Sequence, residues 1–216
     1  MKKGSLLGLV KLSKRSDLHI VRKLWHLGTG LTGLYVYYAS SSTQREMSIY
    51  LFILSFLVFI VEVLRLRIPA INRLAIKIMG PFMRESEVEH YSGFVFYAFG
   101  VALSLFLFPE KYAILSALFL MFADPISSAV GILYGKKKFL PNKSIEGTLA
   151  CAVTCYLITL FYMSCFGYAG TKLFLFSFLA GVIAAVSEML SVWVDDNLTI
   201  PVFSGLGLTV LAHFFY

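Results

Sequence analysis

Seven long apolar stretches constrain this 216-residue chain more than any other feature. A helix needs about 20 apolar residues, within a range of about 17–25, to cross a bilayer. The chain is 58% hydrophobic and only 14% charged, whereas a soluble domain carries about 25% charged residues. The sequence therefore predicts an all-α, polytopic membrane helix bundle with about seven transmembrane helices. The expected spans are 24–41, 48–64, 91–108, 112–133, 146–166, 171–190 and 200–216.

The basic residues predict the orientation of this bundle. With seven alternating spans, 16 of the 19 Lys and Arg residues fall on the side of the N-terminus. Lys and Arg collect in cytoplasmic loops, so we expect the N-terminus inside and the C-terminus outside. The membrane thus explains the net charge of +7, and no nucleic-acid partner is expected. We also expect no cleavable signal peptide, a basic cytoplasmic or interfacial tail over 1–23 with a short amphipathic segment, and one transmembrane domain over 24–216.

An acidic residue, Asp124, lies inside the fourth apolar stretch and is followed by Pro125. A carboxylate at membrane depth is costly, which favours a functional site. The alternative is an acid that pairs with a basic residue of a neighbouring helix. The proline frees a backbone carbonyl and can break the helix locally. Small residues at four-residue spacing form a stripe that lets a neighbouring backbone or a ligand approach closely: Ala123, Ser127, Gly131 and Gly135.

Polar residues also precede the fifth and seventh spans. Ser144 is a candidate N-cap, whose helix would direct backbone N–H groups at the cytoplasmic mouth and attract phosphate. Asp195 and Asp196 lie in a loop without Lys or Arg, so they are either solvated or hold a divalent metal through oxygen ligands. Pro201 suits the first turn of the last span.

The predicted topology brings carboxylates, cations and a helix N-terminus to one face, as a phosphoryl-transfer site requires. The charged residues expected there, besides Asp124, are Lys23, Lys136, Lys143, Glu146, Glu188, Asp195 and Asp196. Arg22 and Lys23 are read either as functional groups or as anchors of a helix end.

Other local patterns predict structure. Residues 28–33 match G-x-G-x-x-G, but no strand precedes them, so we interpret these glycines as helix-packing residues. Glu62 and Arg65 are three residues apart and are expected to form an ion pair. Residues 71–79 predict an interfacial helix that ends at Pro81, followed by a solvated segment around Arg84.

Several of these elements, in this order, resemble the CTP-dependent lipid-alcohol kinases. That family includes dolichol kinase, phytol kinase and CTP-dependent diacylglycerol kinase, and it is distantly similar to phosphatidate cytidylyltransferase. The cytidylyltransferase His-Gly-Gly and Asp-Arg elements are absent, which favours a kinase. The matching residues are Arg22-Lys23 with His26, Ala123-Asp124-Pro125 with Gly131 and Gly135-Lys136, Lys143-Ser144-x-Glu146-Gly147, and Asp195-Asp196-Asn197-x-x-x-Pro201.

The resemblance implies that residues 24–216 form a catalytic domain that transfers the γ-phosphoryl of CTP to a lipid alcohol, such as diacylglycerol or a polyprenol, with Mg²⁺ or another divalent cation. Asp124 would be a metal ligand or the general base. A cytidylyltransferase that forms a CDP-lipid and a transporter are the alternatives. The implied catalytic residues are Lys23, Asp124, Lys143 and Glu146; the nucleotide contacts are Arg22, Gly131, Gly135, Lys136, Ser144, Gly147 and Asn197; and the metal ligands are Asp124, Asp195 and Asp196.

We expect the lipid to enter laterally near the small-residue stripe and the active site to face the cytoplasm. The membrane would be the inner membrane in a bacterium or the endoplasmic reticulum in a eukaryote. The sequence leaves open which lipid alcohol is used, whether CTP is preferred to ATP, and the oligomeric state.

Overall fold

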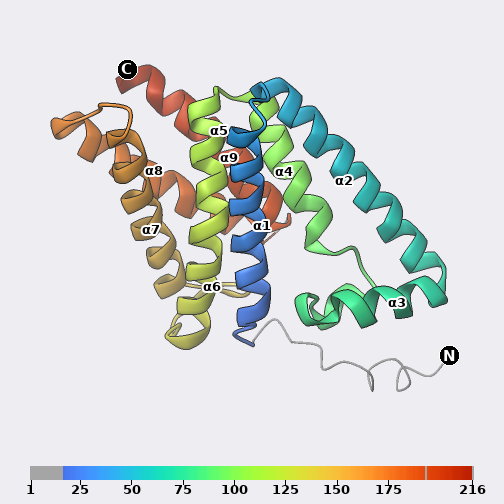
Figure 1. Ribbon diagram of the computed structural model, residues 1–216. Helices are drawn as coiled ribbons and strands as arrows, with labels where there is room; N and C mark the ends of the chain where they lie inside the picture. Colours follow the sequence, from blue (N-terminus) through green and yellow to red (C-terminus); the bar gives the residue numbers. More distant parts are fainter. Residues whose placement is uncertain (1–16, 193, 216) are drawn as a thin grey trace.

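A computed structural model describes residues 17–192 and 194–215 of the chain as helices with one short β hairpin. The expected surface segment within residues 1–16 lies outside the described residues. The all-α prediction is confirmed (Figure 1). The elements are α1 Ile20–Ala39, α2 Gln44–Arg67, α3 Pro69–Met79, 3₁₀ turns Gly80–Phe82 and Glu85–Val88, α4 Gly93–Leu107, α5 Glu110–Leu118, a π-helical turn Phe119–Ala123, α6 Asp124–Leu133, β1 Lys138–Leu140, β2 Lys143–Ser144, α7 Ile145–Ser164, α8 Gly170–Leu190 and α9 Asp196–Phe215.

Five helices of the described residues are long and apolar enough to cross a membrane. They are α2, the continuous helix formed by α5 and α6, and α7 to α9. Helix α4 is apolar but shorter, and α1 occupies the first expected range. A membrane helix bundle is therefore confirmed, while the count of seven crossings stays a prediction. The last helix begins at Asp196, four residues before the expected start, so Pro201 lies inside α9 and not in its first turn.

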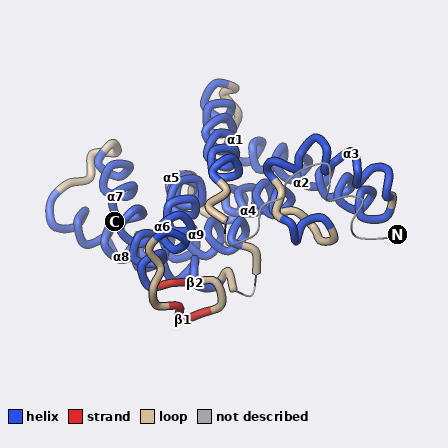
Figure 2. The backbone as a smooth tube through the Cα atoms, turned by 90° about the horizontal axis from the view of Figure 1, so that it is seen from below, coloured by secondary structure: helices blue, strands red, loops and turns tan. Residues whose placement is uncertain are grey.

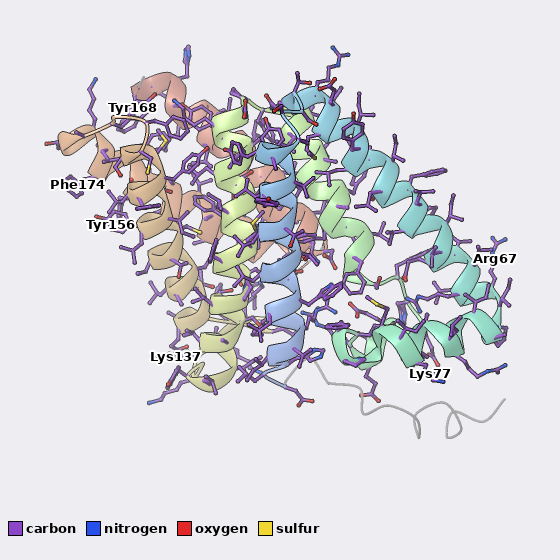
Figure 3. The ribbon with its side chains drawn as sticks, viewed as in Figure 1. Arg67, Lys77, Lys137, Tyr156, Tyr168 and Phe174 are labelled. Atoms are coloured by element: carbon purple, nitrogen blue, oxygen red, sulfur yellow. The ribbon has the colours of Figure 1, made fainter. Side chains whose placement is uncertain are left out.

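The helices run alternately between two ends of the bundle. The start of α1, helix α3 and the end of α6 lie at one end, and the C-terminus lies at the other (Figure 1). The labelled Lys77 and Lys137 project at the first end, opposite Tyr168 (Figure 3). This separation of basic residues agrees with the predicted orientation, which itself stays a prediction.

The main core lies where α5, α7, α8 and α9 meet. Phe119, Cys155, Phe176 and Leu208 have no exposed surface there. Helix α1 packs beside this core through Gly30, where an added Cβ would lie 2.9 Å from Met121 Sδ. The packing role expected for the glycines of residues 28–33 holds for Gly30 but is wrong for Gly28 and Gly33, because an added Cβ at either would meet nothing within 4 Å.

The predicted Glu62–Arg65 pair is confirmed, and it joins α2 to the chain that follows. Arg65 Nε and Nη2 each donate to a carboxylate oxygen of Glu62 at 2.6 Å. Arg65 also donates to Asn72 Oδ1 of α3 at 3.2 Å and to the His90 carbonyl at 2.7 Å, while the Ser92 N–H donates to Glu62 at 2.7 Å. The guanidinium is 1% exposed. Because α2, α3 and the start of α4 all contact this pair, it fixes that corner of the bundle.

Replacing Arg65 by Met should therefore destabilise the protein by about 3–5 kcal/mol, because Glu62 would remain buried without its cation. Unfolding in detergent, followed by circular dichroism, measures this loss. Arg67→Met removes an exposed charge at the end of the same helix (Figure 3) and should change stability by less than about 0.5 kcal/mol. Equal effects of the two substitutions would contradict the structural role of the pair.

Candidate active site

A polar cavity of about 270 Å³ lies at the end of the bundle that carries the hairpin. Seen from below, the hairpin lies beside α6 and α9 at this end (Figure 2). Residues from α6, the hairpin and the adjoining ends of α7, α8 and α9 contribute, with one arginine from the loop after α3. The lining residues are Arg84, Asp124, Ser127, Ser128, Gly131, Ile132, Gly135, Lys138, Asn142, Lys143, Ser144, Gly147, Glu188 and Asp196.

A π-helical turn positions Asp124 in this cavity. The helix is not broken at Pro125 as the sequence suggested; it continues from α5 into α6 through the turn Phe119–Ala123. A π turn pairs each carbonyl with the N–H five residues on, and for Leu120 that residue is Pro125, which has no N–H. His26 Nε2 of α1 donates to the Leu120 carbonyl at 3.2 Å instead. A side chain of a neighbouring helix thus satisfies the carbonyl, and such turns are frequent at functional sites.

The small-residue stripe of α6 packs against the first turn of α7. An added Cβ on Gly135 would lie 2.7 Å from Ser144 Oγ, and one on Gly147 would lie 2.9 Å from the Ser127 carbonyl. Ser144 Oγ accepts a hydrogen bond from the Gly147 N–H at 3.1 Å, which confirms the predicted N-cap. The stripe thus admits a neighbouring backbone, and Ser127, Gly131 and Gly135 also line the polar cavity, so entry of the lipid beside the stripe stays a prediction. The close packing brings the positive end of α7 to the cavity.

Lys143 is held by a buried ion pair. Its ammonium donates to Glu188 Oε1 near the end of α8, and the Thr148 hydroxyl donates to Glu188 Oε2 at 3.3 Å. The Lys143 side chain is 9% exposed and that of Glu188 is 5% exposed. Glu188 was expected at this end of the bundle but not as a site residue. The pair joins α8 to the wall of the cavity. Lys143 therefore has a structural partner in Glu188 and also lines the space that a ligand would occupy.

The two cations of α1 differ in their surroundings. Lys23 Nζ donates to Ser128 Oγ of α6 at 2.9 Å, at the wall of the cavity. Arg22 turns toward the loop after α3, where it donates to Glu87 Oε2 at 2.9 Å and to the Phe82 carbonyl at 3.0 Å. The structure therefore brings Lys23 to the site and leaves Arg22 outside its lining.

Asp195, just before α9, and Asp196, at its start, have different surroundings. Asp196 lines the cavity. Asp195 is not among its lining residues; its Oδ1 accepts from the Asn197 backbone N–H at 3.0 Å and from Asn197 Nδ2 at 2.8 Å. Asn197 Nδ2 also donates to the Gly93 carbonyl at 3.3 Å, so it links α9 to α4. Burial and the charge of Asp196 raise the pKa of Asp195, while the hydrogen bonds from Asn197 oppose this rise.

Two further predicted residues lie beside the cavity without lining it. The Glu146 carboxylate interacts with the backbone N–H groups of Lys136 and Lys137. The Lys136 side chain is exposed. The contact of Glu146 with this backbone joins the segment between α6 and β1 to the first turn of α7.

The predicted metal ligands do not form a complete set. No group of three or more His, Cys, Asp or Glu side chains suited to a metal occurs within residues 17–192 and 194–215. Asp124 and Asp196 nevertheless line the same cavity. Mg²⁺ is commonly held by one or two carboxylates together with substrate phosphates, so these two acids fit such an ion once a phosphate ligand is bound.

Besides Glu188, sequence reasoning did not assign Arg84, Lys138 and Asn142 to the site. Arg84 was interpreted as part of a solvated segment, yet the 3₁₀ turns on either side bring it to the cavity. Lys138 and Asn142 come from the hairpin, which has no clear periodic signal in three- and two-residue strands. Asp124 takes part in none of the ion pairs formed by the described residues, and Arg84, Lys143 and Asp196 line the same cavity. This arrangement favours a functional acid over a structural one.

Together, the helices and the cavity define an integral membrane protein with a charged site at one end of its bundle. The profile of the cytidylyltransferase family matches residues 7–193. The chain is 39% identical to CTP-dependent diacylglycerol kinase 1 of Schizosaccharomyces pombe over 154 aligned positions, which cover 66% of this chain and 71% of the relative. It is 29% identical to CTP-dependent diacylglycerol kinase 1 of Saccharomyces cerevisiae over 91% of this chain and 74% of the relative.

A phytol kinase of Synechocystis is 27% identical over 88% of this chain and 78% of the relative. No solved structure matches the chain. The protein therefore belongs to the cytidylyltransferase family, within its group of CTP-dependent lipid kinases.

The buried pair at the cavity wall gives a stability test. Lys143→Met should cost about 3–5 kcal/mol, because Glu188 is left as a buried unpaired charge. Glu188→Gln in the same chain should restore most of this loss, since the remaining amide is neutral and can still accept from Thr148. Unfolding of wild type, both single variants and the double variant in one detergent measures the coupling. Additive losses in the double variant would show that the two side chains do not stabilise each other.

Proposed function

We propose that this protein is a membrane kinase that transfers the γ-phosphoryl group of CTP to the hydroxyl of a lipid alcohol. The observation that carries this proposal is the similarity to CTP-dependent diacylglycerol kinases over as much as 91% of the chain. Diacylglycerol is the first candidate acceptor, and the similarity to a phytol kinase supports a long-chain isoprenoid alcohol as the second. The polar cavity supports the proposal independently, because it contains the groups that phosphoryl transfer uses.

We place the nucleotide phosphates at the start of α7. Ser144 and Gly147 line the cavity at this turn. The Ile145 and Gly147 N–H groups already donate to the Lys137 carbonyl and to Ser144 Oγ, so the positive end of the helix dipole is what favours a bound phosphate. Lys138 and Arg84 line the same space and supply positive charge. Positioning and neutralisation of the transferring phosphoryl group provide most of the catalysis in such reactions. Arg84 is therefore assigned to the phosphate site, where the sequence alone did not place it.

Two roles fit Asp124 in this arrangement. As a general base, its carboxylate would take the proton of the lipid hydroxyl while the hydroxyl oxygen bonds to the γ-phosphorus and the bond to the CDP oxygen breaks. The products are a lipid phosphate monoester and CDP. As a metal ligand, Asp124 together with Asp196 would hold Mg²⁺, which would neutralise charge on the phosphates. Lys23, bonded to Ser128 one turn from Asp124, would add positive charge close to the transferring phosphoryl group.

The competing reaction is cytidylyl transfer, which would form a CDP-lipid and release pyrophosphate. The curated relatives are named as kinases, so this alternative is not favoured. The transporter alternative loses support for the same reason, and because the charged cavity opens at one end of the bundle.

Turnover by the purified protein tests the function. CTP labelled at the γ-phosphate should transfer its label to diacylglycerol or to an isoprenoid alcohol, whereas CTP labelled at the α-phosphate should leave the lipid unlabelled. ATP in parallel reactions measures the nucleotide preference. Asp124→Asn should lower turnover by at least about 100-fold while the protein stays folded, because removing a positioned acid–base group costs about 10²–10⁴-fold. Labelled lipid from the α-phosphate would instead establish a cytidylyltransferase.

We further propose that the N-terminus and the polar cavity face the cytoplasm, either at the endoplasmic reticulum or at a bacterial inner membrane. The distribution of Lys and Arg supports this orientation. A native cysteine provides the test: Cys165, at the opposite end of the bundle, is exposed, whereas Cys151 and Cys155 are fully buried.

In sealed vesicles with their cytoplasmic face outside, a membrane-impermeant maleimide should not label Cys165 until the vesicles are opened. Lys137→Cys, at the other end of the bundle (Figure 3), should be labelled in sealed vesicles when Cys165 is replaced by Ser. The reverse pattern would overturn the proposed orientation.

A further inference from the structure

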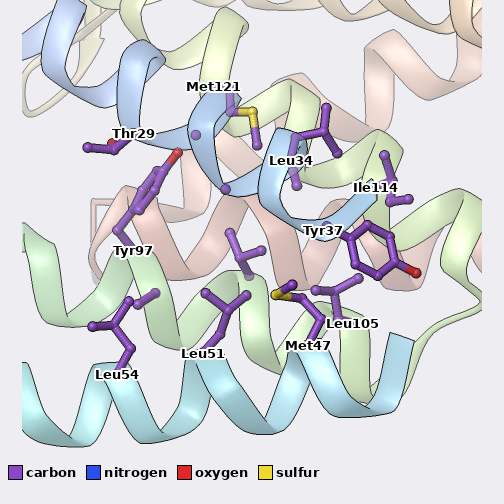
Figure 4. Close-up of a pocket in the computed structure, with 15 residues that line it drawn as sticks. Thr29, Leu34, Tyr37, Met47, Leu51, Leu54, Tyr97, Leu105, Ile114 and Met121 are labelled. Carbon is purple, nitrogen blue, oxygen red and sulfur yellow. The ribbon is translucent and has the colours of Figure 1, made fainter. Parts of the chain in front are cut away.

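A second cavity, of about 200 Å³, has the opposite chemistry to the polar one. It lies between α1, α2, α4 and α5 (Figure 4). Leu34 of α1, Leu51 and Leu54 of α2, Val101 of α4 and Ile114 of α5 line it with apolar surface. We call this space the apolar groove. The polar site described above does not account for it.

The few polar groups of the apolar groove already have partners. The Thr29 hydroxyl donates to the Trp25 carbonyl at 2.8 Å, and the Tyr97 hydroxyl donates to the His26 carbonyl at 3.3 Å. At the far end, the Tyr37 hydroxyl donates to Glu110 Oε1 at 2.6 Å. A cavity without free polar groups gives water little to bind. The groove therefore suits a hydrocarbon chain.

The shape of the groove also fits a chain. It follows α1 from Thr29 to Tyr37 (Figure 4), a length of about 12 Å for eight residues of α-helix. Gly33 lines it and is exposed, and an added Cβ there would meet nothing within 4 Å. Val36 on α1 and Ile53 on α2, close in sequence to the lining residues Gly33 and Leu54, are exposed and apolar. The groove thus opens between α1 and α2 toward a surface suited to the bilayer interior.

The other end of the groove lies next to the candidate catalytic acid. Met121 lines the groove and belongs to the π turn, three residues before Asp124 in one continuous helix. Tyr97, which also lines the groove, packs edge-on against His26, with ring centroids 4.4 Å apart, and His26 Nε2 donates to the Leu120 carbonyl of the same π turn at 3.2 Å. An apolar chain in the groove would consequently end beside the polar cavity.

We propose that the apolar groove binds one hydrocarbon chain of the lipid-alcohol substrate, which enters from the bilayer between α1 and α2 and directs its hydroxyl past Met121 toward Asp124. The proposal rests on the proposed kinase function for the identity of the ligand. It gives the lipid a different path from the expected route beside the small-residue stripe of α6, whose residues Ser127, Gly131 and Gly135 line the polar cavity.

Two glycines of α1 provide a matched pair of variants. Gly33→Leu would place a side chain in the groove, whereas Gly28→Leu adds the same side chain to the same helix where Gly28 does not line the groove. An added Cβ meets no neighbour at either position. Gly33→Ala adds one methyl group and serves if the leucine variant inserts poorly.

The first measurement is the steady-state kinetics of phosphorylation of a long-chain diacylglycerol. Each methylene excluded from an apolar site weakens binding by roughly fourfold, so Gly33→Leu should raise the KM for the lipid at least about tenfold. Its KM for CTP should not change, and Gly28→Leu should match wild type in both constants. Equal lipid KM values for the two leucine variants would overturn the proposal while leaving the kinase function intact.

The second measurement does not need turnover. A diacylglycerol with a diazirine on its acyl chain, irradiated with the protein in phosphatidylcholine vesicles, should label the peptide of α2 that contains Leu51 and Leu54. Excess unlabelled diacylglycerol should compete, and Gly33→Leu, but not Gly28→Leu, should abolish the label. If the wild type phosphorylates no lipid alcohol but this labelling pattern is found, the kinase function fails and the chain-binding groove stands. If neither excess unlabelled diacylglycerol nor Gly33→Leu reduces the labelling, the probe contacts the protein from the bulk lipid. That result would overturn the proposal that the groove binds a lipid chain.

Discussion

The close packing of α6 on the first turn of α7 is the contact on which the site depends. Gly135 and Gly147 leave no room for a side chain against Ser144 and the Ser127 carbonyl. Because these helices approach so closely, the positive end of α7 opens into the same cavity as Asp124. The adjoining Lys143–Glu188 pair then fixes the end of α8 at this corner. A larger residue in the stripe would move the helix N-terminus away from the acid, and the cavity would lose the positive end of α7 from its wall.

Charge placement in this bundle follows from the cost of burying an ion. The three ion pairs formed by the described residues join Arg22 to Glu87, Arg65 to Glu62 and Lys143 to Glu188. The first two lie outside the polar cavity and hold the loop after α3 against α1 and α2. The cavity differs, since Asp124 and Arg84 line it outside these pairs. Groups that are not mutually neutralised remain available to a charged ligand, which is why a phosphate-bearing substrate suits this space.

Local rules account for what the sequence predicted. The long apolar stretches predicted the helices, and each expected range contains one. The hydroxyl of Ser144 before a helical stretch predicted the N-cap, and the three-residue spacing of Glu62 and Arg65 predicted their ion pair. The misses depend on contacts between distant segments. Arg84 reaches the cavity because two 3₁₀ turns fold its loop back, and no periodicity in the sequence encodes that path. The π turn before Asp124 depends on His26, 94 residues from the carbonyl that it satisfies.

That π turn also relates the two cavities to each other. A kinase acting on a membrane lipid must bring a hydrophilic nucleotide and a hydrophobic alcohol together. The nucleotide needs a polar environment, and the lipid chain needs an apolar one. Met121 belongs to the apolar groove and Asp124 to the polar cavity, although one short segment of a single helix carries both. In the proposed binding mode, contacts with the lipid chain would position its hydroxyl, since contacts remote from the reacting atoms contribute to orientation. Asp124, the proposed catalytic acid, thus lies where the apolar groove approaches the polar cavity.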